Sequence, residues 1–489
     1  MGIANSKRYA IRVVSVANDF DRKRFNEFLR NEIRESTVEV TNFPWSDCSL
    51  LLADISAILI HSLPNRTLSR KLIREKIWLS RPTVHFVHSF SGTAAEQIKW
   101  ATFWGQWHGW PPCRLIAPSE ATAARVRALQ KHVEGFGGEM PDVVVVAPAV
   151  DVTACASGDR FAGRQRLSCT TASKVVLCIA RLTPEKLDHA QLIDAFAALT
   201  PRFHAGHDAR LVFAGGVAPS DTEYVKDLRA RGQMRGISLT IYEHVSDRDK
   251  LDLLAAADVF VSPASHPQES FGLAIVEAMA AGLPIVATNW NGYKEVLPPA
   301  YRPYLVPTIA DRLAARNLED SRLCEACAVD FWSLVDRLEL FLRDPELRGL
   351  LAEEGKRRAQ FFTREEFTGK VLMLLDELIL EHQAGPKAKP PHTEVPDLRS
   401  PIDYMASTYL HENSILDLSA TFAGSAGSVS ALVAKALEQS ERKTLSSLTS
   451  LFDGDILLRN LAILSLLRSG YLRIKDASVL PASACLPTF

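Results

Sequence analysis

Short apolar runs alternate with longer amphipathic stretches along the first 300 residues. Apolar runs of this kind predict buried strands, and apolar residues recurring every three or four positions predict helices. Strands that alternate with helices predict βαβ units and parallel sheets. The expected strands fall into two series, at 9–17, 57–62, 83–90, 114–117 and 142–151, and then at 174–181, 209–216, 238–245, 258–264 and 284–289.

Two such series predict an α/β protein with two doubly wound, Rossmann-like sheets and a ligand cleft between them. The break falls in the polar stretch 152–172, so we expect a first domain at 1–155 and a second at 156–384, which ends in helices from about 328. Five prolines within 385–401 indicate a linker.

The last segment, 402–489, is expected to be an accessory helical domain. Helices at 428–439 and 459–470 would precede a strand at 471–476, an order that is winged-helix-like. The segment lacks a cluster of lysine and arginine, which disfavours nucleic acid and favours contact with a protein or peptide. A helical cap over a hydrophobic surface is the alternative.

Composition excludes several classes of protein. Among 489 residues, 56 lysines and arginines nearly cancel 57 aspartates and glutamates, so no net charge favours a nucleic acid or an anionic membrane. No apolar run approaches the ~20 residues of a transmembrane helix. We see no secretory signal and expect a cytoplasmic protein. The opening MGIANS matches the short myristoylation pattern, so peripheral attachment to a membrane is the alternative.

The eight cysteines are scattered, as expected in a reducing cytosol. Cys324 and Cys327 form a single CxxC pair, which by itself cannot complete a tetrahedral zinc site. We interpret them as small residues near a junction between a loop and a helix.

The stretch QESFGLAIVEAMAAG, residues 268–282, places a charge inside an apolar helix. Glu277 is the one charged residue from Leu273 to Ala281, and a buried carboxylate needs a partner. A ribose diol would supply two hydroxyl donors; a nearby arginine, or a helix end open to water, would serve equally. Glu269 stands just before the helix, where such a loop would touch a sugar.

The start of that helix is a candidate anion site. We expect Ser270, Phe271 and Gly272 in its first turn, where backbone N–H groups lack helical partners. Gly272 would let a ligand approach the main chain closely. An ordinary turn between strand and helix remains the alternative.

The motif ARLTPEK follows the first strand of the second series and carries Arg181 and Lys186. In open α/β sheets, ligands bind beyond the carboxyl ends of the strands. A guanidinium and an ammonium there suit a diphosphate, although a solvated basic pair would show the same sequence.

Taken together, ARLTPEK, FAGG and DVFVSPASHPQESFGLAIVEAMAAGLPIVAT resemble the retaining glycosyltransferases of the GT-B fold, in particular family 4. The resemblance covers about 170–300 well and extends more weakly to about 80–155 and 355–380. RRAQFFTREEFTGKVLMLLDEL looks like the family's helices that cross back to the first domain. The resemblance implies transfer of a sugar from a nucleoside-diphosphate sugar, the co-substrate, to an acceptor bound by the first domain, without a further cofactor.

The resemblance also implies the roles of the candidate catalytic residues. Arg181 and Lys186 would neutralise the leaving diphosphate, Glu269 would orient the sugar hydroxyls, and His88, in HFVHSFSG, would touch the sugar from the first domain. The other implied donor contacts are Ser270, Phe271, Gly272, Leu273, Glu277, the strand-end Gly215, and Val245 at the exit of the base-binding strand.

No metal is implied, because basic residues would do the work of a cation. The one Asp-x-Asp string, Asp453-Gly454-Asp455, stands beside an expected helix start, where capping explains it.

Three departures from the family pattern leave the acceptor and the nucleobase open. The first strand is followed by VANDFDRK instead of a glycine-rich turn, and Leu187 and Glu243 stand where glycine is usual. Other activities on this scaffold remain open as well. A phosphorylase would respond to inorganic phosphate, an epimerase would need no acceptor, a pseudo-glycosyltransferase would join a cyclitol to an amine, and a non-catalytic binder would not turn over.

Overall fold

The structure of the chain is a computed structural model. It describes residues 11–16, 38–43, 56–60, 81–90, 94–104, 111–135, 138–202, 208–311, 325–386, 408–409, 416–418, 456–468 and 472–474. Several expectations lie outside these residues. They are the helices that the pattern predicts between the first strands, at 19–35 and 68–80, the helix at 428–439, most of the linker, Cys324, and the string Asp453-Gly454-Asp455.

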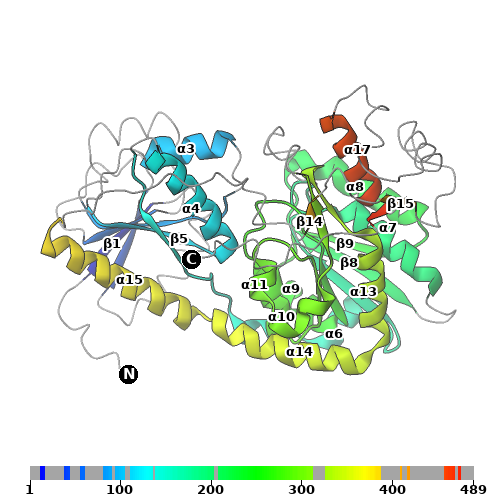
Figure 1. The fold of residues 1–489 in the computed structure, drawn as a ribbon. Helices are drawn as coiled ribbons and strands as arrows, with labels where there is room; N and C mark the ends of the chain where they lie inside the picture. Colours follow the sequence, from blue (N-terminus) through cyan, green and yellow to red (C-terminus); the bar gives the residue numbers. More distant parts are fainter. Residues whose placement is uncertain are drawn as a thin grey trace. The chain divides into compact units, whose positions relative to one another are not determined.

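The chain divides into two compact units, which are described separately (Figure 1). Residues 1–149 and 362–401 form the first unit, and residues 150–361 and 402–489 form the second. The chain therefore returns to the first unit after residue 361, and the C-terminal segment groups with the second unit.

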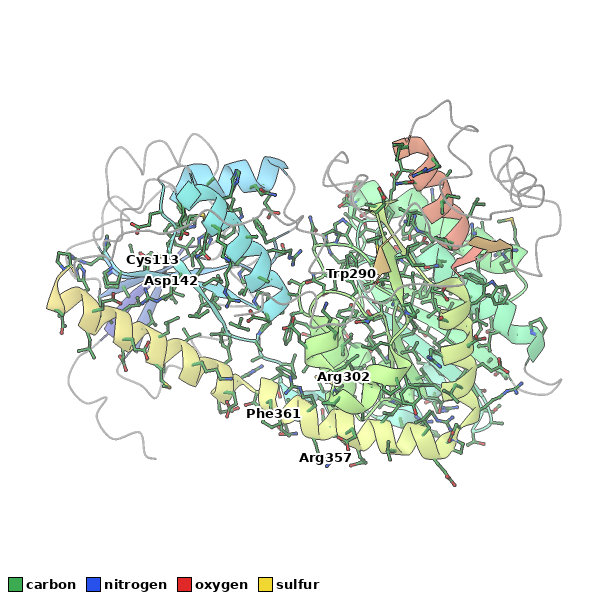
Figure 2. The ribbon with its side chains drawn as sticks, in the orientation of Figure 1. Cys113, Asp142, Trp290, Arg302, Arg357 and Phe361 are labelled. Atoms are coloured by element: carbon green, nitrogen blue, oxygen red, sulfur yellow. The ribbon has the colours of Figure 1, made fainter. Side chains whose placement is uncertain are left out.

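The first unit contains a six-stranded sheet in the order β2-β1-β3-β4-β5-β6, in which all neighbours are parallel. Its strands are β1 (Ile11–Val16), β2 (Val38–Phe43), β3 (Ala57–Ile60), β4 (Thr83–Phe86), β5 (Cys113–Ala117) and β6 (Asp142–Val145). Figure 2 shows Cys113 and Asp142, the first residues of the neighbouring strands β5 and β6. The pattern predicted every strand except β2.

Helices cover both faces of this sheet, because side chains alternate between faces along a strand. Ile58 and Ile60 pack in one core with the helices α3 (Ala94–Trp104) and α4 (Glu120–Gly135). Ala57 and Leu59 pack in another core with α15 (Arg364–Ala384). The stretch whose sequence suggested a crossing back to the first domain therefore lies on the first sheet.

The second unit contains a five-stranded parallel sheet in the order β11-β10-β7-β8-β9. Its strands are β7 (Lys174–Ile179), β8 (Ala209–Gly215), β9 (Ser238–Glu243), β10 (Val259–Ser262) and β11 (Ile285–Ala287). The connecting helices are α7 (His189–Leu199), α8 (Thr222–Met234), α9 (Asp247–Ala256) and α10 (Leu273–Ala280), followed by α11 (Tyr293–Val296), α13 (Phe331–Arg343) and α14 (Pro345–Ala359). Short 3₁₀ turns stand at Thr200–Arg202, Pro219–Asp221, Pro299–Tyr304 and Gln360–Phe362.

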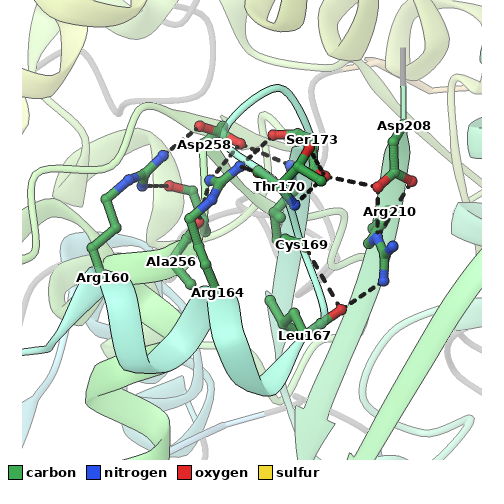
Figure 3. A network of polar contacts seen from close by, with 12 residues as sticks. Arg160, Arg164, Leu167, Cys169, Thr170, Ser173, Asp208, Arg210, Ala256 and Asp258 are labelled. Atoms are coloured by element: carbon green, nitrogen blue, oxygen red, sulfur yellow. Dashed lines mark hydrogen bonds and ion pairs between the residues drawn. The ribbon is translucent and has the colours of Figure 1, made fainter. Parts of the chain in front are cut away.

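The polar stretch between the two series is helical and firmly attached to the second unit. It contains α5 (Val152–Cys155) and α6 (Arg160–Arg166), each capped by an aspartate side chain. Arg160 and Arg164 both reach Asp258 just before β10, with N–O distances of 2.9 and 3.4 Å (Figure 3). The polar character of this stretch therefore reflects a hydrogen-bonded network rather than a loose linker.

The C-terminal segment packs on the second unit. Helix α17 (Ile456–Arg468) contacts β13 (Cys327–Val329), and Ile463, Leu464, Leu466 and Leu467 are buried. Strand β14 (Thr408–Tyr409) extends the sheet of β12 (Thr308–Ala310) and β13, while β15 (Leu416–Leu418) pairs with β16 (Leu472–Ile474). The expected helix and strand are both present, and the helix packs its buried side chains within the second unit.

Cys327 was misplaced by the sequence interpretation. It lies fully buried in the strand β13, where it pairs with Ala310, and not at a junction between loop and helix.

Among the described residues, no group of acidic, histidine or cysteine side chains is arranged to hold a metal ion. Within the same residues, no helix has the length and hydropathy needed to cross a membrane.

Candidate active site

The carboxyl ends of the parallel strands in the second unit bring the candidate residues to one edge of the sheet. Arg181 and Lys186 follow β7, Val245 follows β9 and Glu269 follows β10, while Gly215 ends β8. Gly215 fits tightly here, because a Cβ atom would stand 1.7 Å from the Ala180 carbonyl oxygen. The strand ends therefore meet as the doubly wound pattern predicts.

Lys186 and Glu269 are in direct contact. The distance from Lys186 Nζ to Glu269 Oε2 is 2.5 Å, and the side chains are 22% and 12% exposed. The two residues come from different βα connections, 83 positions apart in sequence, and the structure places them together. Charge-assisted pairs of this kind are strong when they are shielded from water.

Arg181 lies on the same connection as Lys186, after β7, and its side chain is exposed. Within the described residues, its guanidinium has no hydrogen bond or ion pair. An exposed arginine on the same connection as a partly buried lysine is available to an incoming polyanion, because binding the polyanion breaks no existing contact of the arginine.

The connection that carries Glu269 is held by side chains of the segment after β11. Asn291 lies in the left-handed region with φ 44° and donates from Nδ2 to the Glu269 carbonyl oxygen at 2.7 Å. Three further bonds of the same kind run from Thr288 to Ala264, from Trp290 to His266 and from Asn291 to Pro267, each to a carbonyl oxygen. Trp290 is fully buried in the second unit (Figure 2). We call residues 288–293 the clamp segment.

Tyr293, the last residue of the clamp segment, lies under the start of α10. Its hydroxyl shares a hydrogen bond of 2.7 Å with Ser262 Oγ at the end of β10. Burial raises the pKa of Tyr293 well above its usual value of 10, and the nearby negative charge of Glu269 raises it further. The phenol therefore stays protonated and available as a donor beside Glu269.

Gly272 is required by two features of its position. Its φ of +99° is rarely adopted by residues with a side chain, and a Cβ atom there would come within 2.6 Å of Tyr293 Cε1. Gly272 caps α10, which begins at Leu273. Ser270 and Phe271 precede the helix and are buried, so the expectation that all three residues lie in its first turn was wrong.

This shift changes which N–H groups face outward at the helix start. The amides of Ile275 and Val276 already donate to the Gly272 carbonyl oxygen. Helix geometry leaves the amides of Leu273 and Ala274 as the open donors. Leu273, which the resemblance implies as a donor contact, supplies one of these two open amides.

Glu277 is buried in α10 and has a partner, as its position demanded. Lys250 of α9 places its Nζ 3.0 Å from Glu277 Oε1, and Asp247 lies 3.9 Å from the same Nζ. The partner is a lysine and not an arginine. Nothing in the sequence around Lys250 signals this pairing, because lysines on helices are common and usually solvated.

Two candidate residues, Val245 and His88, belong to neither of the two glutamate–lysine pairs. Val245 is half-buried after β9, where His244 takes φ 53° and Glu243 pairs with Arg229 at 2.7 Å. The glutamate at the usual glycine position is therefore used in a local ion pair. His88 belongs to the first unit, is exposed, and stacks on Phe86 with 6.1 Å between ring centroids.

Known proteins are similar to this chain in the region that contains the candidate site. Residues 159–358 match the family described as glycosyl transferases group 1. This part of the chain is similar to that family, and residues 159–358 are called the family region below. The family region contains ten of the eleven candidate residues, all except His88.

Curated relatives match the same part of the chain and more. The chain is 31% identical over 179 residues to a phosphatidyl-myo-inositol mannosyltransferase of Mycobacterium tuberculosis, which covers 37% of this chain. It is 26% identical over 302 residues, 59% of its length, to a D-inositol 3-phosphate glycosyltransferase of Rhodococcus jostii. The chain spans 43% and 60% of the lengths of these two relatives.

Solved structures confirm the fold. Anabaena HepE in complex with UDP and glucose aligns over 75% of this chain and 100% of its own, with a TM-score of 0.53 and 16% identity. Sucrose-phosphate synthase of Thermosynechococcus elongatus aligns over 76% of this chain and 99% of its own, with a TM-score of 0.56 and 14% identity. The α/β fold with two parallel sheets is that of the GT-B glycosyltransferases.

Proposed function

We propose that the chain transfers a sugar from a nucleoside-diphosphate sugar to an acceptor hydroxyl and retains the configuration at the anomeric carbon. The observation that carries the proposal is the Lys186–Glu269 pair, with the exposed Arg181 on the same connection as Lys186, at the strand ends of a region that matches the glycosyl transferases group 1. The cations suit a diphosphate and the carboxylate suits sugar hydroxyls.

The cations act on the leaving group. As the bond between the anomeric carbon and the diphosphate oxygen lengthens, negative charge develops on the diphosphate. Arg181 and Lys186, with the amide of Leu273, stabilise that charge from fixed positions. Such preorganised groups accelerate the step because they need no rearrangement as the charge appears.

The acceptor hydroxyl attacks the anomeric carbon from the face that the diphosphate leaves, so the configuration is retained. The electron pair of the broken bond stays on the diphosphate, which also takes the acceptor's proton. Glu269 orients the sugar hydroxyls and stabilises the positive charge that builds on the ring. When a diphosphate engages Lys186, it competes with Glu269 for the ammonium and leaves the carboxylate to the sugar.

The remaining residues bind the donor. Glu277, held by Lys250 at 3.0 Å, accepts hydrogen bonds from the ribose hydroxyls. The segment of Ser270 and Phe271 approaches the sugar and diphosphate, whereas Gly215 and Val245 lie toward the nucleobase.

A panel of uridine and guanosine diphosphate sugars, assayed with and without acceptors, tests the proposal. The names of the relatives make phosphatidyl-myo-inositol and D-inositol 3-phosphate the first acceptors to include. Transfer with a retained anomer, identified by proton NMR, supports the proposal. Sugar release that requires inorganic phosphate indicates a phosphorylase, conversion of the donor sugar without an acceptor indicates an epimerase, and binding without turnover contradicts catalysis.

Lys186→Ala links turnover to the site. Loss of one preorganised charge lowers kcat by about 100-fold or more. Lys226→Ala is the matched control, because Lys226 is exposed on α8 and pairs with Glu223. Equal activity of the two variants would remove Lys186 from the mechanism.

A further inference from the structure

The last residue of α17, Arg468, contacts the segment that leads out of the candidate site. Its Nη2 donates to the Cys327 carbonyl oxygen at 2.6 Å, and its Nε lies 3.6 Å from Asp188 Oδ2. Its own carbonyl oxygen accepts a hydrogen bond of 2.7 Å from Gln191 Nε2. One residue of the C-terminal segment thus joins β13 to the first turn of α7.

Asp188 is the point where this contact meets the site. It caps α7, with Oδ1 accepting from the Gln191 amide at 2.9 Å while Oδ2 faces Arg468. It stands two positions after Lys186, and the intervening Leu187 is buried. The segment 181–188 is therefore attached at one end to β7 and at the other end to the capped start of α7.

We propose that Arg468 is a positioning residue for the donor site: through Asp188 it fixes the segment 181–188 and so holds Lys186 and Arg181 in place for the diphosphate. The inference rests on the proposed function for the identity of the ligand. It gives residues 456–468, which lie beyond the family region of 159–358, a part in donor binding.

The other end of α17 provides a control. Asn460 donates from Nδ2 to Asp311 Oδ2 at 2.7 Å, and this bond also attaches the helix to the second unit. Asn460 is buried, and its side chain hydrogen-bonds Asp311 and Arg459; among the described residues, no hydrogen bond joins it to the segment 181–188. Removing Asn460 therefore loosens α17 without touching Asp188, whereas removing Arg468 does both.

Hydrogen–deuterium exchange of the full chain measures the effect without relying on turnover. Arg468→Ala is expected to speed exchange of the amides in 182–191 by about tenfold, as the loss of a charge-assisted bond predicts. Asn460→Ala is expected to leave that peptide unchanged while speeding exchange in α17. Equal exchange of 182–191 in both variants, or no change with Arg468→Ala, overturns the proposal.

Asp188→Asn separates charge from capping. Asparagine keeps the side-chain oxygen that caps α7 but loses the charge that faces Arg468. It should reproduce the exchange of Arg468→Ala, and the double variant should add nothing further. Additive effects would mean that Arg468 acts on the segment by another route and would contradict the proposal.

Kinetics connect the segment to the donor. Arg468→Ala should raise the donor KM by about fivefold, the lower end of coupling between separate sites, and Arg468→Lys should restore part of it. Asn460→Ala should leave KM unchanged. A donor KM that stays constant in Arg468→Ala, despite faster exchange, would overturn the role in donor binding. Absence of turnover in the parent protein would instead contradict the proposed function and leave the exchange result intact.

Discussion

The second unit contains two glutamate–lysine pairs, whose glutamates are eight positions apart in sequence, and the two pairs differ in their surroundings. Glu269 pairs with Lys186 at 2.5 Å on connections that follow β10 and β7. Glu277 pairs with Lys250 at 3.0 Å between the helices α10 and α9. The side chains of both pairs are similarly shielded, so burial alone does not distinguish them.

The difference lies in what holds each glutamate. Glu277 is carried by a regular helix whose packing fixes its backbone. Glu269 lies on an irregular connection, and the clamp segment 288–293 holds that connection with side-chain hydrogen bonds to its carbonyl oxygens. An irregular connection supported in this way lets a charged pair stand at the edge of the sheet, where ligands bind in open α/β folds. Under the proposed function, Glu269 therefore takes part in the reaction and Glu277 in donor binding.

The largest expected difference comes from neutralising each glutamate in turn. Glu269→Gln should lower kcat by about 100-fold to 1,000-fold, because it removes a charge aimed at the reacting sugar. Glu277→Gln should raise the donor KM by about tenfold with little change in kcat, because it weakens a contact made equally in the ground and transition states. Steady-state kinetics with a turned-over donor measure both.

If Glu269→Gln and Glu277→Gln changed kcat and KM in the same way, the two glutamates would not have the different roles proposed for them. Lys250→Ala extends the comparison, because it should follow Glu277→Gln in raising KM. A collapse of kcat in Lys250→Ala would place the second pair at the reacting centre instead.

The next effect concerns the start of α10. Gly272→Ala should lower the free energy of unfolding by about 2 kcal/mol, because alanine is strained at positive φ and its Cβ would meet the buried Tyr293 ring. Gly216→Ala is the control, since a Cβ atom there meets nothing within 4 Å. Urea unfolding compares the two; equal midpoints would mean that the position tolerates a side chain.

The clamp segment offers a smaller test. Asn291→Gly keeps the left-handed backbone but removes two hydrogen bonds to carbonyl oxygens, so it should cost about 1.5 kcal/mol of stability and lower kcat about fivefold. Asn291→Ala adds backbone strain to the same loss and should be less stable than the glycine variant. Wild-type kcat in Asn291→Gly would show that Glu269 does not depend on the clamp.

The smallest effect involves the Tyr293 hydroxyl. Because the pKa of Tyr293 is raised in the folded chain, its contribution to stability is complete below pH 10, the usual tyrosine value, and is lost as the pH rises above it. Tyr293→Phe should remove part of this alkaline loss, although it costs about 1 kcal/mol at pH 8 through the missing hydrogen bond. Unfolding free energies at pH 8 and 10.5 test this, and parallel curves would contradict it.

Much of the fold follows from the sequence because buried parallel strands are continuous apolar runs. All five strands of the second sheet were predicted in order, and each lies within the residue range that the sequence pattern predicts. Strand β2 was missed because its sequence, VEVTNF, alternates polar and apolar residues instead of forming such a run. The helices at 152–166 were missed because aspartate caps and arginines read as a polar linker.

The site was predictable where chemistry and topology coincide. Arg181, Lys186 and Glu269 each follow a strand of the second sheet, so the rule for strand ends selects them. Lys250 and the Arg468–Asp188 contact depend on which helices pack together, which one sequence does not specify. Asn291 and Tyr293 also follow a strand end, that of β11, and applying the same rule there would have found them.

Calorimetry of nucleoside diphosphate binding tests the central claim most directly. Arg181 is exposed and has no side-chain partner in the described residues, so Arg181→Ala should leave the fold intact. Arg302→Ala is the matched control, because Arg302 is also an exposed arginine of the second unit (Figure 2). UDP or GDP, whichever binds the parent protein, should bind Arg181→Ala about 10-fold to 100-fold more weakly and Arg302→Ala as before. Unchanged affinity in Arg181→Ala would contradict a diphosphate site at the end of β7.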